Sequence, residues 1–277
     1  MRICISVQVL VLIKVFSIPV QGVQYSIAIA SALSGSDICY SGYWFNSRNP
    51  ATLASWQTNA FGISYQNLYF IPGLSTQSLS GTIASEGTWG YSLDYFGTHA
   101  LNESCLSLSY GRKIFRRFDL GISMKAHSLS VEALSERSYA VSCDIGLIMR
   151  LQREVSLGVH LVNPNRSVYF TTDEEALSAQ TNLGLAYHPG NIFYLAIQAH
   201  WLNYSAFFLS VGSEYRIGRT LALQAGIKVG FSTGYSWGIL IDFRQVSLAL
   251  GFEQHACLGI TSAVTVCYKL SRYADQD

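Results

Sequence analysis

The stretch from residue 105 to residue 127 reads CLSLSYGRKIFRRFDLGISMKAH, and it decides the fold of the chain. It holds two runs in which apolar residues alternate with small or polar ones, joined by a short basic turn. Leu106 and Leu108 leave one face of the first run, and the serines that follow each of them leave the other, because successive side chains of a strand point to opposite faces. The stretch therefore predicts a β-hairpin with one apolar face and one polar face.

The same period of two returns towards the C-terminus, in the runs 209–215 and 221–231. A helix would need apolar residues at every third or fourth position instead. Fourteen such strands can be placed from the sequence, most of them near the length of about 9 to 11 residues that a tilted membrane-spanning strand needs. They are predicted at 59–67, 76–85, 88–97, 104–112, 117–128, 138–149, 154–163, 179–188, 191–201, 206–216, 219–231, 235–243, 245–254 and 257–269.

Composition indicates what each face of these strands meets. Charged residues make up 13% of the chain, whereas an ordinary soluble domain carries about 25%. Hydrophobic residues make up 49%, and the mean hydropathy is +0.24. The polar face of each strand is mostly Ser, Gly, Thr and Ala rather than Lys and Glu. We therefore predict an all-β, closed, antiparallel transmembrane β-barrel whose apolar face meets lipid and whose polar face lines the interior.

The charge balance and the N-terminus limit the location and the partners of the chain. A net charge of +1 gives no basic field for nucleic acid, and we expect no nucleic-acid partner. Residues 1–22 are interpreted as an export signal, because Arg2 precedes a mostly apolar run from Val9 to Phe16. An ordinary first strand or an uncleaved anchor is the alternative, since Lys14 interrupts that run.

The segment 23–58 lacks the alternation, and we predict that it folds inward as a plug or caps one mouth of the barrel, which is predicted over 59–270. The connections along the barrel fall alternately into a short, arginine-rich set and a longer set, of which 165–177 is the longest. Thr172 and Glu175 in this loop have the spacing of a capping box for a short helix, with an unstructured loop as the alternative. Short turns face the periplasm in outer-membrane barrels, so the plug and the C-terminus are expected there.

Part of the predicted plug resembles a known family. Ala32-Leu33-Ser34-Gly35-Ser36, then Trp44-Phe45-Asn46, then Asn49-Pro50-Ala51-Thr52-Leu53-Ala54 are similar to the N-terminal signature of a superfamily of outer-membrane barrels. That superfamily includes the long-chain fatty-acid transporters and the PorV and PorQ proteins of the type IX secretion system. The resemblance implies a location in the outer membrane of a Gram-negative bacterium, and it marks Asn49, Pro50 and Ala51 as the plug motif.

The polar faces of the strands also carry charged, amide and histidine side chains that we expect to line the lumen. They are Asp94, Asp119, Lys125, His127, Asp144, His160, Gln198, His200, Glu214, Gln224, Lys228, Asp242 and Glu253. Buried charges have to be paired in any case. These residues either form a paired polar interior that anchors the plug or line a passage for a solute.

The residue pattern does not favour catalysis or metal binding. The six histidines lack the spacing of metal ligands. His127 precedes Ser128, but the alternation sends these two side chains to opposite faces of the strand. The cysteines lack paired spacing and are interpreted as small packing residues. We therefore predict a protein that is not an enzyme and that uses neither a metal nor another cofactor.

Two functions follow from the family resemblance. In the first, the barrel is a transporter that passes small hydrophobic solutes across the outer membrane, beside the plug. In the second, it is a non-transporting accessory of a protein secretion or surface-assembly system, like PorV and PorQ, and meets a protein partner at its rim. The lipid bilayer is a partner in both. The outer loops are short for the large extracellular groove of the fatty-acid transporters, and the two functions stay open at this point.

Overall fold

The computed structural model describes residues 27–41, 48–132, 136–169, 176–203, 206–231 and 233–270. The predicted export signal and the predicted capping box of Thr172 and Glu175 lie outside these residues. Across the described ranges, we find no helix whose length and hydropathy would suit a membrane span.

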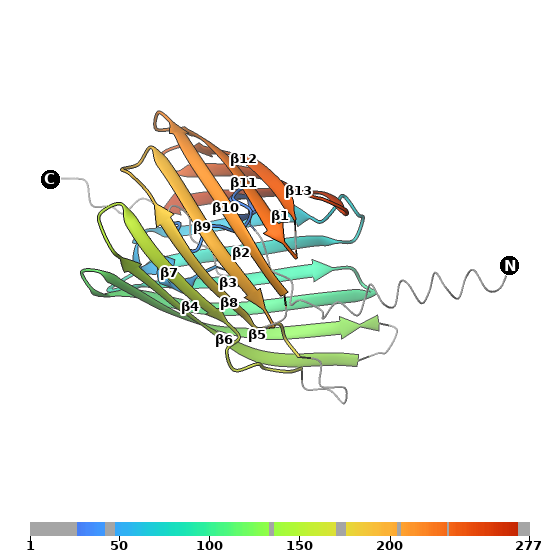
Figure 1. The fold of residues 1–277 in the computed structure, drawn as a ribbon. Coiled ribbons are helices and arrows are strands. Elements are labelled where there is room, and N and C mark those ends of the chain that lie inside the picture. The colour runs from blue at the N-terminus through green and yellow to red at the C-terminus, as the bar shows by residue number, and fades with distance from the viewer. Residues whose placement is uncertain are drawn as a thin grey trace.

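Fourteen antiparallel strands within the described residues form one closed barrel, in which neighbours in sequence are paired and β1 closes on β14 (Figure 1). The ends of every strand lie within three residues of the predicted ones, and the predicted closed all-β barrel is confirmed. The strands are β1 (Asn59–Asn67), β2 (Ser75–Ala84), β3 (Thr88–Gly97), β4 (Leu101–Phe115), β5 (Phe118–Val131), β6 (Glu136–Arg150), β7 (Val155–Val162), β8 (Gln180–Tyr187), β9 (Phe193–Leu202), β10 (Ala206–Ile217), β11 (Leu221–Gly230), β12 (Gly234–Asp242), β13 (Val246–His255) and β14 (Gly259–Leu270).

The two faces of the wall have the polarity that the alternation predicts. Leu106 is 59% exposed on the outer face, whereas Ser107 is 2% exposed on the inner face. The same contrast holds along the paired strand β5, where Ile122 is exposed and Ser123 is buried. An outer surface covered with large apolar side chains suits contact with lipid rather than with water.

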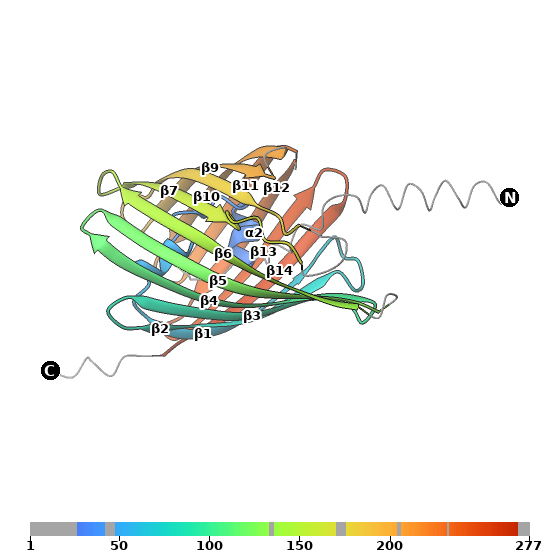
Figure 2. The same ribbon diagram turned by 90° about the horizontal axis from the view of Figure 1, so that it is seen from below.

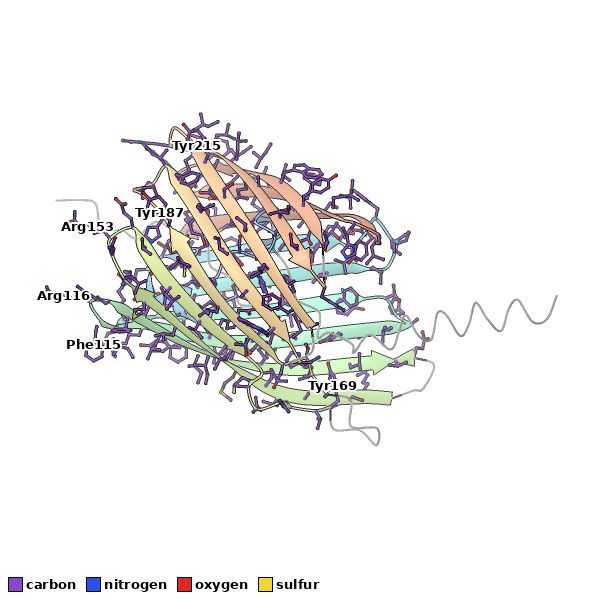
Figure 3. The ribbon with its side chains drawn as sticks, in the orientation of Figure 1. Phe115, Arg116, Arg153, Tyr169, Tyr187 and Tyr215 are labelled. Carbon is purple, nitrogen blue, oxygen red and sulfur yellow. The ribbon has the colours of Figure 1, made fainter. Side chains whose placement is uncertain are left out.

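The two ends of the barrel differ in their connections. At one end, which we call the turn end, the strands are joined by 85–87, 116–117, 151–154, 188–192, 218–220 and 243–245. The opposite end, which we call the loop end, carries the longest connection, 163–179. Figure 3 shows Phe115, Arg116, Arg153, Tyr187 and Tyr215 at the turn end and Tyr169 away from it, on the other side of the molecule.

The described residues before the barrel, 27–41 and 48–58, lie inside it, and we call them the inner segment (Figure 2). The helix α2 (Ala28–Ala32) packs against β11, β12, β13 and β14. The 3-10 helix η1 (Pro50–Ala54) packs against β3, β4, β5 and β6. Both helices are buried along their whole length, so the inner segment occupies the middle of the lumen and contacts the wall on opposite sides.

Candidate functional site in the barrel lumen

A row of glycines on the inner face of the wall makes room for the inner segment. It consists of Gly111, Gly121, Gly146, Gly158, Gly184, Gly212, Gly226, Gly238 and Gly251, and we call it the glycine belt. Each of its nine members faces another member directly across a strand pair. The paired positions are 111 with 121, 121 with 146, 158 with 184, 212 with 226, and 238 with 251. Because glycines have no side chain, the belt leaves a ring of space along the inner face of the wall.

The inner segment fills that ring. It does so mainly with backbone atoms at Gly111, Gly121 and Gly251, and with side chains of Ile38 and Cys39 at Gly158 and Gly184. A Cβ atom added to Gly111 would lie 2.7 Å from the Pro50 carbonyl oxygen, and one added to Gly158 would lie 2.7 Å from the Cys39 sulfur. Real Cβ atoms essentially never approach other atoms to less than 3.0 Å. The absence of a side chain at these positions is thus what allows the inner segment to pack on the wall.

Asn49 ties the two parts of the inner segment to each other and to the wall. Its side-chain oxygen accepts a hydrogen bond from the Ala51 N–H at 3.1 Å and so caps η1, while Pro50 fills the first position of that helix. Its side-chain nitrogen donates to the Ile38 carbonyl oxygen at 3.1 Å and to the Val159 carbonyl oxygen of β7 at 3.4 Å. Accepting one hydrogen bond and donating two requires a side-chain amide. Asn49 is only 1% exposed, so these hydrogen bonds are shielded from water.

Tyr40 fastens the inner segment to the wall near the turn end. Its hydroxyl donates to one carboxylate oxygen of Glu214 at 2.6 Å, and Arg216 donates to the other oxygen at 2.9 Å. The Gln224 amide also donates to this carboxylate, at 2.7 Å, and the Tyr40 ring meets the Tyr194 ring edge-on at a centroid distance of 5.1 Å. Burial, and then the nearby Glu214 carboxylate, raise the pKa of Tyr40 well above its ordinary value, so the phenol stays a neutral donor.

A cavity of about 360 Å³ adjoins this contact, between the inner segment and the wall. A salt bridge between Lys269 and Asp242, with 2.8 Å between the charged atoms, borders it in addition to the pair of Arg216 and Glu214. A volume of this size can hold a small organic molecule. The cavity is lined by Cys39, Tyr40, Ser41, His188, Gly190, Asn191, Phe193, Tyr194, Glu214, Arg216, Asp242 and Lys269.

The residues that follow η1 are held by a second charged contact. Ser55 donates to the Asp119 carboxylate at 3.0 Å, and Arg150 pairs with that carboxylate and donates to the Ser55 oxygen at 3.1 Å. Asp119 is fully buried, so Arg150 supplies the charge that its burial requires. The Trp56 indole N–H donates to the Thr82 hydroxyl at 3.1 Å and completes the attachment to the wall.

A third polar cluster lies farther toward the loop end, on β5, β6 and β7. Lys125 pairs with Asp144 at 2.6 Å, and His160 lies 3.7 Å from the same carboxylate. The Asn163 backbone N–H, where the long loop begins, donates to Asp144 at 3.2 Å. This cluster joins the wall to the loop and, unlike the two before it, contains no residue of the inner segment.

Glu103 links the long loop to a histidine and a serine. The Tyr169 hydroxyl donates to Glu103 at 3.3 Å, the Glu103 carboxylate lies 3.6 Å from His127 Nδ1, and His127 Nε2 is hydrogen-bonded to the Ser142 hydroxyl at 3.0 Å. Serine, histidine and acid in this order are the arrangement of a hydrolase. Ser142 is only 4% exposed, which shields its oxygen from a substrate carbonyl. We infer that these contacts, from Ser142 through His127 to Glu103, hold Tyr169 in position at the loop end.

The sequence also contains a Gly-x-Ser-x-Gly pattern, from Gly234 to Gly238. In α/β-hydrolases this pattern places the nucleophile on a sharp turn between a strand and a helix. Here it lies within the regular strand β12. Ser236 donates to the Ala32 carbonyl oxygen at 2.7 Å and shares a hydrogen bond of 2.7 Å with Ser34. This serine anchors the inner segment and is not presented as a nucleophile.

All the side chains predicted for the lumen are buried or half-buried. Asp119, Lys125, His127, Asp144, His160, Glu214 and Asp242 are placed in the clusters described above, and Gln224 donates to Glu214. Among the rest, Asp94 accepts from Ser92 at 2.8 Å, and Lys228 pairs with Glu253 at 2.6 Å. Gln198 accepts from the Ile38 N–H, and His200 is hydrogen-bonded to Ser210. The predicted residues thus form several separate paired groups rather than one site.

Several residues of these groups escaped the sequence analysis, among them Glu103, Arg150 and Tyr40. Glu103 precedes the predicted start of its strand at 104, although extending the alternation of Ser107 by two inward positions reaches it. Arg150 stands at the very end of β6, where the sequence suggests a turn. Tyr40 lies in a segment without periodicity, so no pattern in the sequence indicates its partner.

No protein-family model and no curated protein matches the sequence. Among solved structures, the Ralstonia pickettii toluene transporter TbuX matches with a TM-score of 0.65 and 9% identity, over 89% of this chain and 98% of that one. The P. putida toluene transporter TodX matches with a TM-score of 0.65 and 13% identity, over 90% and 99%. A Pseudomonas aeruginosa FadL homologue matches with a TM-score of 0.64 and 10% identity, over 89% and 98%. The chain has the fold of these proteins.

The likeness to these structures extends along most of the chain and concerns its fold. It agrees with the resemblance of the N-terminal residues to the superfamily of the fatty-acid transporters. The structures matched here are transporters and channels, such as the CymD monoaromatic hydrocarbon channel, which aligns with a TM-score of 0.61 and 11% identity over 89% of this chain and 98% of that one.

Proposed function

We propose that this protein is a channel that passes small hydrophobic solutes across the outer membrane of a Gram-negative bacterium. The observation that carries the proposal is that the inner segment, rather than side chains of the wall, fills the glycine belt. The inner segment is the plug of this channel, and Asn49, Pro50 and Ala51 hold it in position. The toluene transporters of the same fold support a hydrophobic solute.

The way the plug is attached supports its movement. The hydrogen bonds of the wall run from strand to strand round the closed barrel. The plug is joined to that wall through side chains, among them Tyr40, Asn49 and Ser55. Release of the plug would therefore leave the barrel intact. The solute would pass between the plug and the wall, beside Tyr40, because a cavity of about 360 Å³ already separates them there.

A disulfide that locks the plug tests this function. A Cβ atom added at Gly158 would lie 2.7 Å from the Cys39 sulfur. In a disulfide with an S–S bond of about 2.05 Å, each Cβ lies about 3 Å from the partner sulfur, which is close to this distance. Gly158→Cys should therefore pair with the native Cys39 in the oxidising periplasm. The matched control combines Gly158→Cys with Cys39→Ser. It keeps the new side chain, and with it any shift of the inner segment that this side chain causes, but it lacks the bond.

The readout is the uptake of the hydrophobic fluorophore 1-N-phenylnaphthylamine by cells, because an intact outer membrane excludes it. We expect the wild-type chain and the control to raise uptake, and the locked variant to raise it only after a reductant is added. Equal uptake by the locked and reduced forms would contradict passage beside a moving plug. No uptake with the wild-type chain, together with a protein that co-purifies with it, would favour the accessory function.

A further inference from the structure

The turn end of the barrel carries exposed cations that the acids around them do not neutralise. Seven exposed basic residues stand there against two exposed acids within the described residues. Glu86 pairs with Arg112 at 3.3 Å, and the other acid is Glu154. The remaining six cations make no ion pair with a described residue; they are Lys113, Arg116, Arg117, Arg153, Arg219 and Arg244.

The same turns carry exposed apolar side chains next to these cations. Phe115 is 70% exposed beside Arg116, and Phe243 is 58% exposed beside Arg244. Ile114, Leu151, Ile192 and Ile217 are also exposed in or beside these turns. Turns that face water are usually built from Gly, Asn, Asp and Ser. Apolar and arginine side chains together are instead typical of the boundary between lipid and water, where the arginine heads reach the polar layer.

The outer ends of the strands below these turns add tyrosines to the rim. Tyr187 is 41% exposed and Tyr215 is 55% exposed, and Figure 3 shows both near the turn end, where Phe115, Arg116 and Arg153 also lie. Tyrosine rings settle at the level of the lipid headgroups. The tyrosines place that level at the turn end, within reach of the arginine side chains.

We propose that this rim, which consists of the six unpaired cations and the exposed apolar side chains of the turns, binds the headgroups of anionic phospholipids. Arginine forms paired, charge-assisted hydrogen bonds with phosphate, and the surplus of positive charge selects lipids with a net negative charge. The apolar side chains enter the acyl layer between the headgroups. This binding goes beyond the proposed channel, and its test measures bound lipid rather than solute uptake, so either can fail alone.

The test compares lipid retention by the purified full chain in native mass spectrometry. The chain is mixed with equal amounts of phosphatidylglycerol and phosphatidylcholine. The rim variant carries Arg116→Gln and Arg153→Gln, and the matched control removes two charges from the loop end by Arg137→Gln and Arg166→Gln. We expect wild type to retain phosphatidylglycerol preferentially and the rim variant to lose that preference by about fivefold for each charge removed, while the control keeps it.

Three results would overturn the proposal. The first is equal retention of both lipids by the wild-type chain. The second is an equal loss of preference in the rim variant and in the loop-end control. The third is stronger retention of lipid A, or of an acidic protein, than of phosphatidylglycerol when either one replaces phosphatidylcholine in the mixture. Heat-dependent mobility in gel electrophoresis tests whether both variants contain a folded barrel. Raising the ammonium acetate concentration should weaken the preference of the wild-type chain for phosphatidylglycerol, because salt screens the charges.

Discussion

Replacing Tyr40 by Phe should loosen the inner segment without unfolding the barrel. The change removes the hydroxyl that donates to Glu214 at 2.6 Å and keeps the ring that packs against Tyr194. Glu214 keeps Arg216 and Gln224 as partners, so no buried charge is left unpaired. The change also removes the long hydrogen bond that the hydroxyl accepts from Arg216 at 3.5 Å, which is weak at that distance. The loss is therefore mainly that of the hydrogen bond to Glu214, about 1.5 to 3 kcal/mol.

This loss raises the population of the undocked segment about 10- to 150-fold, since 1.4 kcal/mol corresponds to about a factor of ten. The backbone N–H of Ser36 and of Tyr40 donate within the segment, and that of Ile38 donates to the Gln198 side chain. Hydrogen–deuterium exchange of these amides reports undocking. We expect exchange in 33–41 to accelerate by this factor, while exchange in the strands stays unchanged.

Two tyrosine variants calibrate this measurement. The Tyr194 hydroxyl donates to a neutral acceptor, the Ser36 carbonyl oxygen, at 3.2 Å, so Tyr194→Phe should accelerate exchange only about 2- to 13-fold. Tyr187 lies exposed on the outer face, and Tyr187→Phe should have no effect on the segment. If Tyr40→Phe exchanges no faster than Tyr187→Phe, the contact with Glu214 does not hold the segment.

Three other experiments, one on the native chain and two on variants, probe the lumen. Burial, and then the Asp37 carboxylate, raise the pKa of Cys39 to about 12. The thiolate is therefore scarce at pH 8, so alkylation by iodoacetamide, followed by peptide mass mapping, should be slow and should accelerate as the pH rises. Gly121→Val drives a side chain against Pro50 and should displace η1, which limited trypsin digestion would detect. Lys125→Met removes the cation paired with the buried Asp144 and should lower stability by about 3 to 5 kcal/mol, seen as a lower urea midpoint.

Each of these three experiments has a matched control on the same chain. Cys257 is exposed, and it should be alkylated at least about a hundredfold faster than Cys39 at pH 8. Ala225 faces outward, so Ala225→Val should leave the digestion pattern unchanged. Lys228→Met should cost less than Lys125→Met, because its partner Glu253 is 18% exposed and water compensates the lost charge. A control that behaves like its test variant would contradict the reasoning in each case.

The wall was predictable from the sequence because lipid and lumen impose opposite polarity on consecutive residues. Leu106 and Ser107 fall on opposite faces for this reason, and the same rule locates all fourteen strands. The rule does not say which polar residues meet across the lumen. Tyr40 and Glu214 are 174 residues apart in sequence, and their contact depends on the path of a segment that has no periodicity. The inward glycines were visible in the sequence, but only the structure shows what they accommodate.

The arrangement of the lumen determines which part would have to move in the proposed channel. A single side chain that fills a pore can leave by changing its rotamer. The inner segment rests on the glycine belt with backbone as well as side-chain atoms, so it can only move as a segment. Asn49 joins Ile38 to η1, which couples the two parts of the segment. The pair of Lys125 and Asp144 connects strand to strand and stays behind with the wall. A route therefore opens between the inner segment and the wall beside Tyr40, where the cavity lies, while the barrel remains closed towards the lipid.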